Sequence, residues 1–194
     1  MPVTYVNRKG RRYFLCKGRT RSGKARYYFA REIKDEPVEE IPEGHKISES
    51  VNGIVSLIKD RPELINQDEV SLIEAGLAHH PKAQRYAMRT KRARIIIYEM
   101  SGSDAEELAK AFGAYLPRFT GSEGQIQDFL EKNSQYAPVM QFILTDVDRR
   151  IFRVQRWCYL GGVDDWIDIG YGSLQDLAPR LIPLLGTDSF FDLY

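Results

Sequence analysis

The sequence predicts an α+β fold, built mainly of antiparallel strands in hairpins and a C-terminal meander, with about four short helices. Three observations lead to this prediction. Short aromatic-rich runs separated by turn residues fill the first sixty positions, capping patterns that begin helices appear after residue 60, and alternating apolar runs occupy residues 138–169. The 194 residues are 43% hydrophobic and 28% charged, which is ordinary for a soluble globular protein.

The first sixty residues have the pattern of strands joined by tight turns. The first three strand-like runs lie at residues 3–7, 11–17 and 25–31. Three antiparallel strands are the simplest arrangement for them. An acidic, proline-containing stretch at 35–44 predicts a solvated loop. Asn52-Gly53 then predicts a two-residue hairpin turn between strands at 45–49 and 54–59.

Four helices are predicted from a capping residue that is followed three positions later by a side chain able to hydrogen-bond to the backbone of the capping residue. The pairs are Asn66 with Glu69, Ser103 with Glu106, Ser122 with Gln125, and Ser173 with Asp176. Apolar residues at helical spacing follow each pair. Pro179 and Pro183 are expected to kink or shorten the last helix.

The remaining strands interleave with these helices. Residues 95–100 begin with three β-branched isoleucines and predict a strand, whereas residues 82–92 fit either a helix or a strand. A meander is expected from strands at 138–145, 150–159 and 165–169, with turns at 146–149 and 161–164. The tail at 190–194 is apolar, so we expect it to be docked.

Composition shifts place a boundary near residue 60. We expect a basic β-rich module at 1–60 and an α+β module at 61–194 that contains the β-meander and a terminal helix. The chain starts without an apolar signal segment and has no apolar run near twenty residues, which predicts a cytoplasmic protein and no membrane partner. Cys16 and Cys158 lie in apolar contexts and are expected to be buried free thiols.

No catalytic residue, cofactor or metal is predicted. Residues 18–24 match the G-x-x-x-x-G-K pattern of a phosphate-binding loop, but Ala25 replaces the hydroxyl residue and a strand-like run follows instead of a helix. The adjacent His79 and His80 point in different directions, which opposes chelation. Asp146 and Asp148 are followed by arginines where a calcium loop needs further ligands.

Positive charge is concentrated at the start of the chain. The first 34 residues hold eleven Lys or Arg and one acid, although the whole chain has a formal net charge of +1. Cations interleaved with aromatic residues are typical of a sheet that contacts nucleic acid phosphates, so DNA or RNA is the expected partner of a non-catalytic binding protein. The residues expected to carry the contact are Arg8, Lys9, Arg11, Arg12, Arg19, Arg21, Lys24 and Arg26. A secondary basic patch comprises Lys82, Arg85, Arg89, Lys91, Arg92 and Arg94.

Three alternatives remain open at this stage. The basic strands could dock on acids of the same chain, because residues 35–60 carry seven acids against two lysines. The protein could instead be an adaptor for another protein, with a partner patch at Trp157, Tyr159 and Trp166. It could also be an enzyme with a dispersed site that leaves no local motif. The sequence gives no prediction of the oligomeric state.

Overall fold

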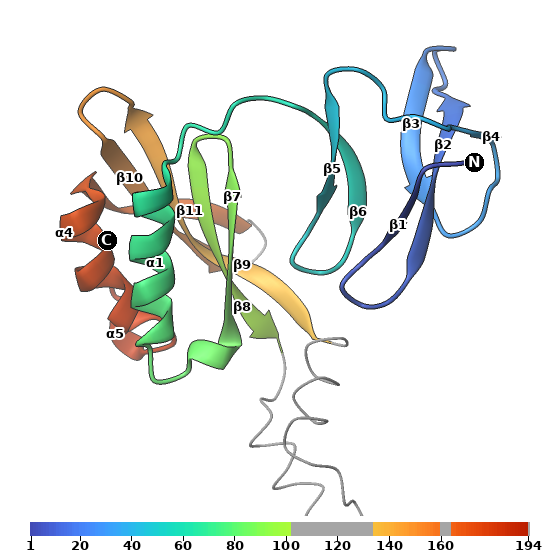
Figure 1. Cartoon of the computed structure of the whole chain (residues 1–194). Coiled ribbons are helices and arrows are strands. Elements are labelled where there is room, and N and C mark those ends of the chain that lie inside the picture. Colours follow the sequence, from blue (N-terminus) through green and yellow to red (C-terminus); the bar gives the residue numbers. More distant parts are fainter. Residues whose placement is uncertain (102–133, 160–163, 194) are drawn as a thin grey trace, which may run out of the picture. The chain divides into compact units, whose positions relative to one another are not determined.

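The computed structural model describes residues 1–101, 134–159 and 164–193, and it confirms the mainly antiparallel α+β architecture (Figure 1). These residues divide into two compact units. The described part of the first unit is Met1–Arg61 with Ser134 and Gln135, and that of the second unit is Pro62–Ser101, Tyr136–Tyr159 and Asp164–Leu193. Within the described ranges, no helix is long and apolar enough to cross a membrane.

The first unit is built of two sheets. One contains β1 (Thr4–Val6), β2 (Arg12–Arg19), β3 (Ala25–Ala30) and β4 (Glu36–Pro37), and the other pairs β5 (His45–Glu49) with β6 (Val55–Lys59). The three predicted N-terminal strands are therefore confirmed. The neighbours Leu15 and Cys16 point to opposite faces of β2, and both are fully buried. Both faces of the sheet are thus covered at its centre.

Three loops of the first unit share one backbone conformation and one hydrogen-bond pattern. Each runs over five residues, with a glycine of positive φ at the fourth position, and the loops are 7–11, 20–24 and 50–54. In each loop the N–H of the fourth residue donates to the carbonyl of the first residue. The N–H of the first residue donates to the carbonyl of the fifth residue. The first side chain of each loop accepts the fifth N–H, at 2.8 Å for Asn7, 3.2 Å for Thr20 and 3.0 Å for Ser50. The expected two-residue turn at Asn52-Gly53 is therefore wrong, because this pattern is a three-residue loop with Gly53 in the left-handed region.

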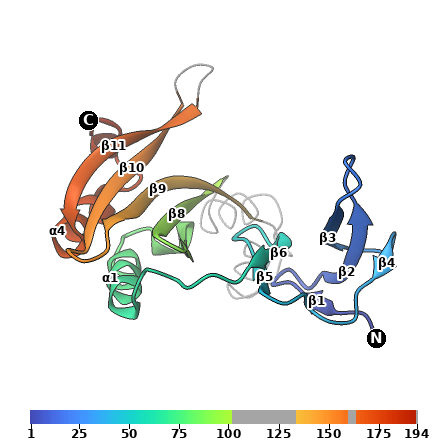
Figure 2. The same cartoon turned by 90° about the horizontal axis from the view of Figure 1, so that it is seen from above.

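The second unit contains one five-stranded sheet in the order β11-β10-β9-β8-β7, and Figure 2 labels the first four of these strands. Its strands are β7 (Tyr86–Lys91), β8 (Arg94–Ser101), β9 (Gln135–Asp146), β10 (Ile151–Tyr159) and β11 (Asp164–Ser173). Its helices are α1 (Gln67–Ala78), α4 (Leu174–Leu181) and α5 (Asp188–Phe191), with 3-10 turns η1 (Ala83–Arg85) and η2 (Ile182–Leu184). The ambiguous stretch 82–92 is thus a short 3-10 turn followed by a strand.

One face of this sheet forms the core with the helices. Ile95 and Ile97 of β8, and Phe142 of β9, are fully buried. They belong to the same apolar cluster as Ile73 of α1 and Leu177 of α4. Because side chains alternate along a strand, the intervening residues of β8 and β9 lie on the opposite face. That face carries a pocket of the second unit.

Two of the four predicted helix starts are confirmed. Asn66 and Glu69 form a complete capping box at α1, and the Ser173 side chain accepts the Asp176 N–H at α4. The helices predicted after Ser103 and Ser122 lie outside the described residues. Glu69 is only 4% exposed, and it also pairs with the Arg150 guanidinium, which ties α1 to the turn between β9 and β10.

The meander and the tail also follow the prediction. β10 pairs with β9 on one side and with β11 on the other, and the turn before Ile151 includes Arg150 at a φ of 53°. Phe190 is 2% exposed, and the Arg156 guanidinium donates to the carbonyls of Phe191 and Leu193, so the tail is docked. Cys16 is a buried free thiol as expected, whereas Cys158 is only half-buried because it lies near the end of β10.

Candidate anion-binding site

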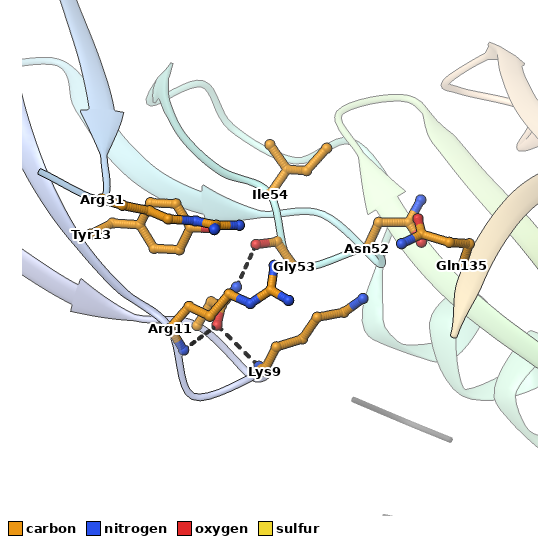
Figure 3. Close-up of a pocket in the computed structure, with 9 residues that line it drawn as sticks. Lys9, Arg11, Tyr13, Arg31, Asn52, Gly53, Ile54 and Gln135 are labelled. Carbon is orange, nitrogen blue, oxygen red and sulfur yellow. Dashed lines mark hydrogen bonds between the residues drawn. The ribbon is translucent and has the colours of Figure 1, made fainter. Parts of the chain in front are cut away.

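A polar pocket of about 280 Å³ lies in the first unit where the loop 7–11 meets the loop 50–54 (Figure 3). Its walls come from the two hairpin loops, from the strands beside them and from the start of β9. The lining residues are Asn7, Lys9, Arg11, Tyr13, Arg31, Asn52, Gly53, Ile54 and Gln135. Three of these side chains are cations and none is a carboxylate.

Asn7 holds the two loops together. Its side chain is buried at 4% exposure, and its Nδ2 donates to the Gly53 carbonyl at 2.6 Å. Its Oδ1 accepts the backbone N–H groups of Lys9 and Arg11 at 3.1 and 2.8 Å. A Cβ on Gly53 would lie only 2.9 Å from Asn7 Nδ2, so the close approach needs glycine at this position. The backbone that carries Lys9 and Arg11 is therefore fixed by the Asn7 side chain.

The pocket concentrates positive charge without neutralising it. Lys9 Nζ donates to the Ser134 carbonyl at 3.1 Å, and Arg11 and Arg31 are exposed. Burial, followed by repulsion from Arg8 and Arg11, lowers the pKa of Lys9 below its ordinary value of 10.5. An anion in the pocket would oppose both effects, because it stabilises the charged form of the amine.

The loop 20–24 presents a second group of predicted cations at its tip and flanks. Arg19, Arg21 and Lys24 are all exposed. Arg26 lies on β3, with its guanidinium 5.8 Å from the ring centre of Tyr28. This loop leads into β3 and not into a helix, so the resemblance of residues 18–24 to a phosphate-binding loop has no structural counterpart.

Most of the predicted cations are not paired with acids of the chain. Lys17, which was not among the candidates, pairs with Glu36 at 3.4 Å. Among the residues that the structure covers, seven of the eight candidates form no ion pair with a carboxylate: Lys9, Arg11, Arg12, Arg19, Arg21, Lys24 and Arg26. The eighth, Arg8, donates its backbone N–H to Glu49 at 3.0 Å.

Four acids of the first unit have partners other than the candidate side chains. Glu39 pairs with the N-terminal ammonium at 3.0 Å, and Asp60 pairs with Lys46 at 3.1 Å. Asp35 accepts the Tyr28 hydroxyl, and Glu49 accepts the Tyr5 hydroxyl at 2.9 Å. Among the described contacts, the seven candidate cations named above therefore form no ion pair with these acids.

The secondary basic patch lies on the β7–β8 hairpin of the second unit and the turn before it. Arg85 is half-buried, lies 3.6 Å from Glu99 and donates to the Met100 carbonyl at 3.1 Å, so it is engaged within the unit. The other members are exposed: Lys82, Arg89, Lys91, Arg92 and Arg94.

The aromatic patch predicted for a protein partner is a cross-strand pair. Trp157 on β10 lies directly opposite Trp166 on β11, with ring centres 5.1 Å apart in an edge-to-face arrangement. Both side chains are half-buried. Tyr159 lies on β10 opposite Asp164. In the described ranges, no group of three or more His, Cys, Asp or Glu residues is placed to hold a metal ion.

Of the nine lining residues, the predicted contact residues included only Lys9 and Arg11, and they did not include Asn7, Tyr13, Arg31, Asn52, Gly53, Ile54 and Gln135. The repeated pattern of a polar residue followed three positions later by glycine, at Asn7, Thr20 and Ser50, would have identified the loops. It would not have shown that two of them meet, because that contact joins residues 46 positions apart.

Comparison with known proteins gives no relative to draw on: no family model, no curated protein and no solved structure matches the chain. Function is therefore inferred from the geometry of these sites alone.

Proposed function

We propose that this chain is a non-catalytic protein that binds nucleic acid, DNA or RNA, through phosphate contacts from the first unit. The observation that carries the proposal is the pocket between the loops 7–11 and 50–54, where Lys9, Arg11 and Arg31 converge without a carboxylate among the lining residues. A phosphate group offers the negative charge and the acceptor oxygens that this arrangement lacks.

The exposed loop 20–24 supports a wider contact than one phosphate. Arg19, Arg21 and Lys24 extend the positive surface along the β2–β3 hairpin, and none of them is committed to an acid of the described chain. Tyr13, Tyr27 and Tyr28 are half-buried, so base stacking contributes less here than charge. Binding by the first unit should therefore depend weakly on nucleotide sequence and strongly on salt.

Replacing the loop cations tests the part of this proposal that concerns the loop 20–24. The variant Arg19→Gln/Arg21→Gln/Lys24→Gln should bind random-sequence DNA and RNA more weakly than the wild type. The slope of log affinity against log salt should become shallower by up to about 0.9 for each phosphate that the variant no longer neutralises, because fewer counterions are released. Filter binding at two salt concentrations measures both quantities.

A matched control removes the same charge elsewhere in the first unit. Lys34→Gln/Lys59→Gln/Arg61→Gln changes three exposed cations outside the pocket and the loop, and it should retain a steeper slope than the loop variant. If the loop variant binds with the wild-type affinity and slope, loop 20–24 is not part of the contact.

An adaptor role for the Trp157–Trp166 pair has less support. The two rings pack against each other and are half-buried, which is the ordinary environment of a cross-strand aromatic pair. Binding of nucleic acid is the proposal that the cations of the first unit favour.

A further inference from the structure

The second unit has a pocket of its own at the β7–β8 turn. Its volume is about 580 Å³, within the range of small-molecule sites, and it is lined by Leu64, Lys91, Arg92, Ala93, Arg94, Ile96 and Ile143. Four lining residues are apolar and three are cations, and none is acidic. A ligand that fits this wall has an apolar body and a negative charge.

The apolar part of the pocket lies on the sheet face away from the helices. Ile95 and Ile97 are buried in the core, so Ile96 between them points to the other side of β8. Ile143 lies on that same side of β9, because its neighbours Phe142 and Leu144 are core residues. Both isoleucines are half-buried, and together they form an apolar floor.

The cations at the pocket rim lie in positions that cost electrostatic and conformational free energy. Lys91 lies directly opposite Arg94 in the hairpin register, and like charges in this position destabilise a strand pair. Arg92 has a φ of 52°, a conformation that a non-glycine residue adopts at a cost. The turn is held in place because the Arg92 carbonyl accepts the Leu64 N–H at 2.9 Å and the Ala93 carbonyl accepts the Leu144 N–H at 2.8 Å. An anion bound at this rim would offset the repulsion between Lys91 and Arg94.

We propose that this pocket takes one nucleotide of a single strand, with its base on the floor of Ile96 and Ile143 and its phosphate between Lys91 and Arg94. Arg89 continues the same face of β7, about 6.6 Å from Lys91, and is placed for a neighbouring phosphate. The inference rests on the proposed function and deepens it. It adds a preference for unpaired bases, which phosphate contacts from the first unit do not provide.

The test separates bases from phosphates. Full-length protein is titrated against a labelled strand of eight thymidines and against a strand of the same length whose sugars carry no bases. Fluorescence anisotropy should give the intact strand about fivefold tighter binding or more, because one face of a base is removed from water on the floor of Ile96 and Ile143. Ile143→Ala should reduce this preference, and Lys91→Gln/Arg94→Gln should remove most of it.

A charge-matched variant provides the control. Arg149→Gln/Arg180→Gln removes two exposed cations of the second unit that do not line the pocket, and it should keep the preference for the intact strand. Thermal unfolding shows whether each variant is folded. If Ile143→Ala does not fold, the variant at the exposed Lys91 and Arg94 decides the question.

Each outcome is informative. Equal binding of the two strands by the wild type overturns the nucleotide pocket but leaves the proposed phosphate binding intact. A preference that survives the Lys91→Gln/Arg94→Gln change places the base elsewhere and also overturns it. Binding to neither strand overturns the proposed function and this inference together.

Discussion

Tyr86 has a buried phenol whose surroundings differ strongly from water. It is 9% exposed, and its hydroxyl has no hydrogen-bond partner in the part of the chain that the structure describes. The edge of the His80 ring lies against it, with ring centres 4.9 Å apart. Burial, together with the negative charge of Glu99, raises the pKa of Tyr86 to about 12. The phenol therefore contributes to the pH dependence of stability.

This pKa shift predicts a loss of stability in alkali. Between about pH 10 and 12 the native state holds a proton that the unfolded state releases, so the free energy of unfolding falls as the pH rises. Tyr86→Phe should be neutral or slightly stabilising at pH 7, because the buried hydroxyl that it removes has no hydrogen-bond partner among the described residues. From pH 10 to 12 the wild type should lose about 1–2 kcal/mol relative to the variant, measured by denaturant unfolding. Parallel stability curves would show that Tyr86 does not titrate with folding.

The hairpin loops are the elements that position the candidate site. Gly10 and Gly53 occupy the same place in two of them, with φ of 73° and 75°. A Cβ on Gly10 would meet nothing within 4 Å, whereas a Cβ on Gly53 would crowd Asn7 Nδ2 at 2.9 Å. A substitution at Gly10 therefore introduces backbone strain alone, whereas the same substitution at Gly53 also disturbs the contact that joins the loops.

Comparing Gly10→Ala with Gly53→Ala measures what the contact between the loops contributes to stability. Gly10→Ala should cost about 1 kcal/mol of stability from the left-handed backbone alone. Gly53→Ala should cost more and also weaken binding to nucleic acid, because Asn7 must move and release the Lys9 backbone. Urea unfolding and filter binding of both variants provide the comparison. Equal effects of the two substitutions would mean that the loops do not depend on each other.

Local elements were the most predictable part of this chain. The helix starts at Asn66 and Ser173 were correct because the capping residue and its partner are three positions apart and need no tertiary contact. The length of the loop 50–54 was missed because an Asn-Gly pair fits a two-residue turn as well as this longer one. Whether 82–92 formed a helix or a strand was decided by the pairing of β7 with β8.

The candidate sites were predicted only in part. The cations Lys9 and Arg11 could be read from the charge run, but their convergence with Arg31 follows from strand pairing and from the Asn7–Gly53 bond between distant loops. Likewise, the cluster at Lys91 and Arg94 was visible, whereas Ile143 joins it from a strand some fifty residues later. The residue types at these sites could be recognised in the sequence, but the residues that lie next to them in the fold could not.

Charge at the scale of the whole molecule follows the division into two units. Residues 1–61 carry fourteen Lys or Arg against eight acids, residues 102–135 carry three against six, and the ranges 62–101 and 136–194 carry eleven against thirteen. The near-neutral total of +1 therefore hides the basic excess of residues 1–61. An anionic polymer would be drawn to the first unit by this excess, and its attraction would weaken as salt screens the charge.

The salt dependence of nucleic acid binding by the full chain tests the proposed phosphate contacts most directly. Filter binding against random-sequence DNA and RNA at 50 and 200 mM salt should give a clear fall in affinity, about 40-fold if three phosphates are contacted. No retention of nucleic acid at either concentration, or an affinity that does not change with salt, would contradict phosphate binding by the first unit.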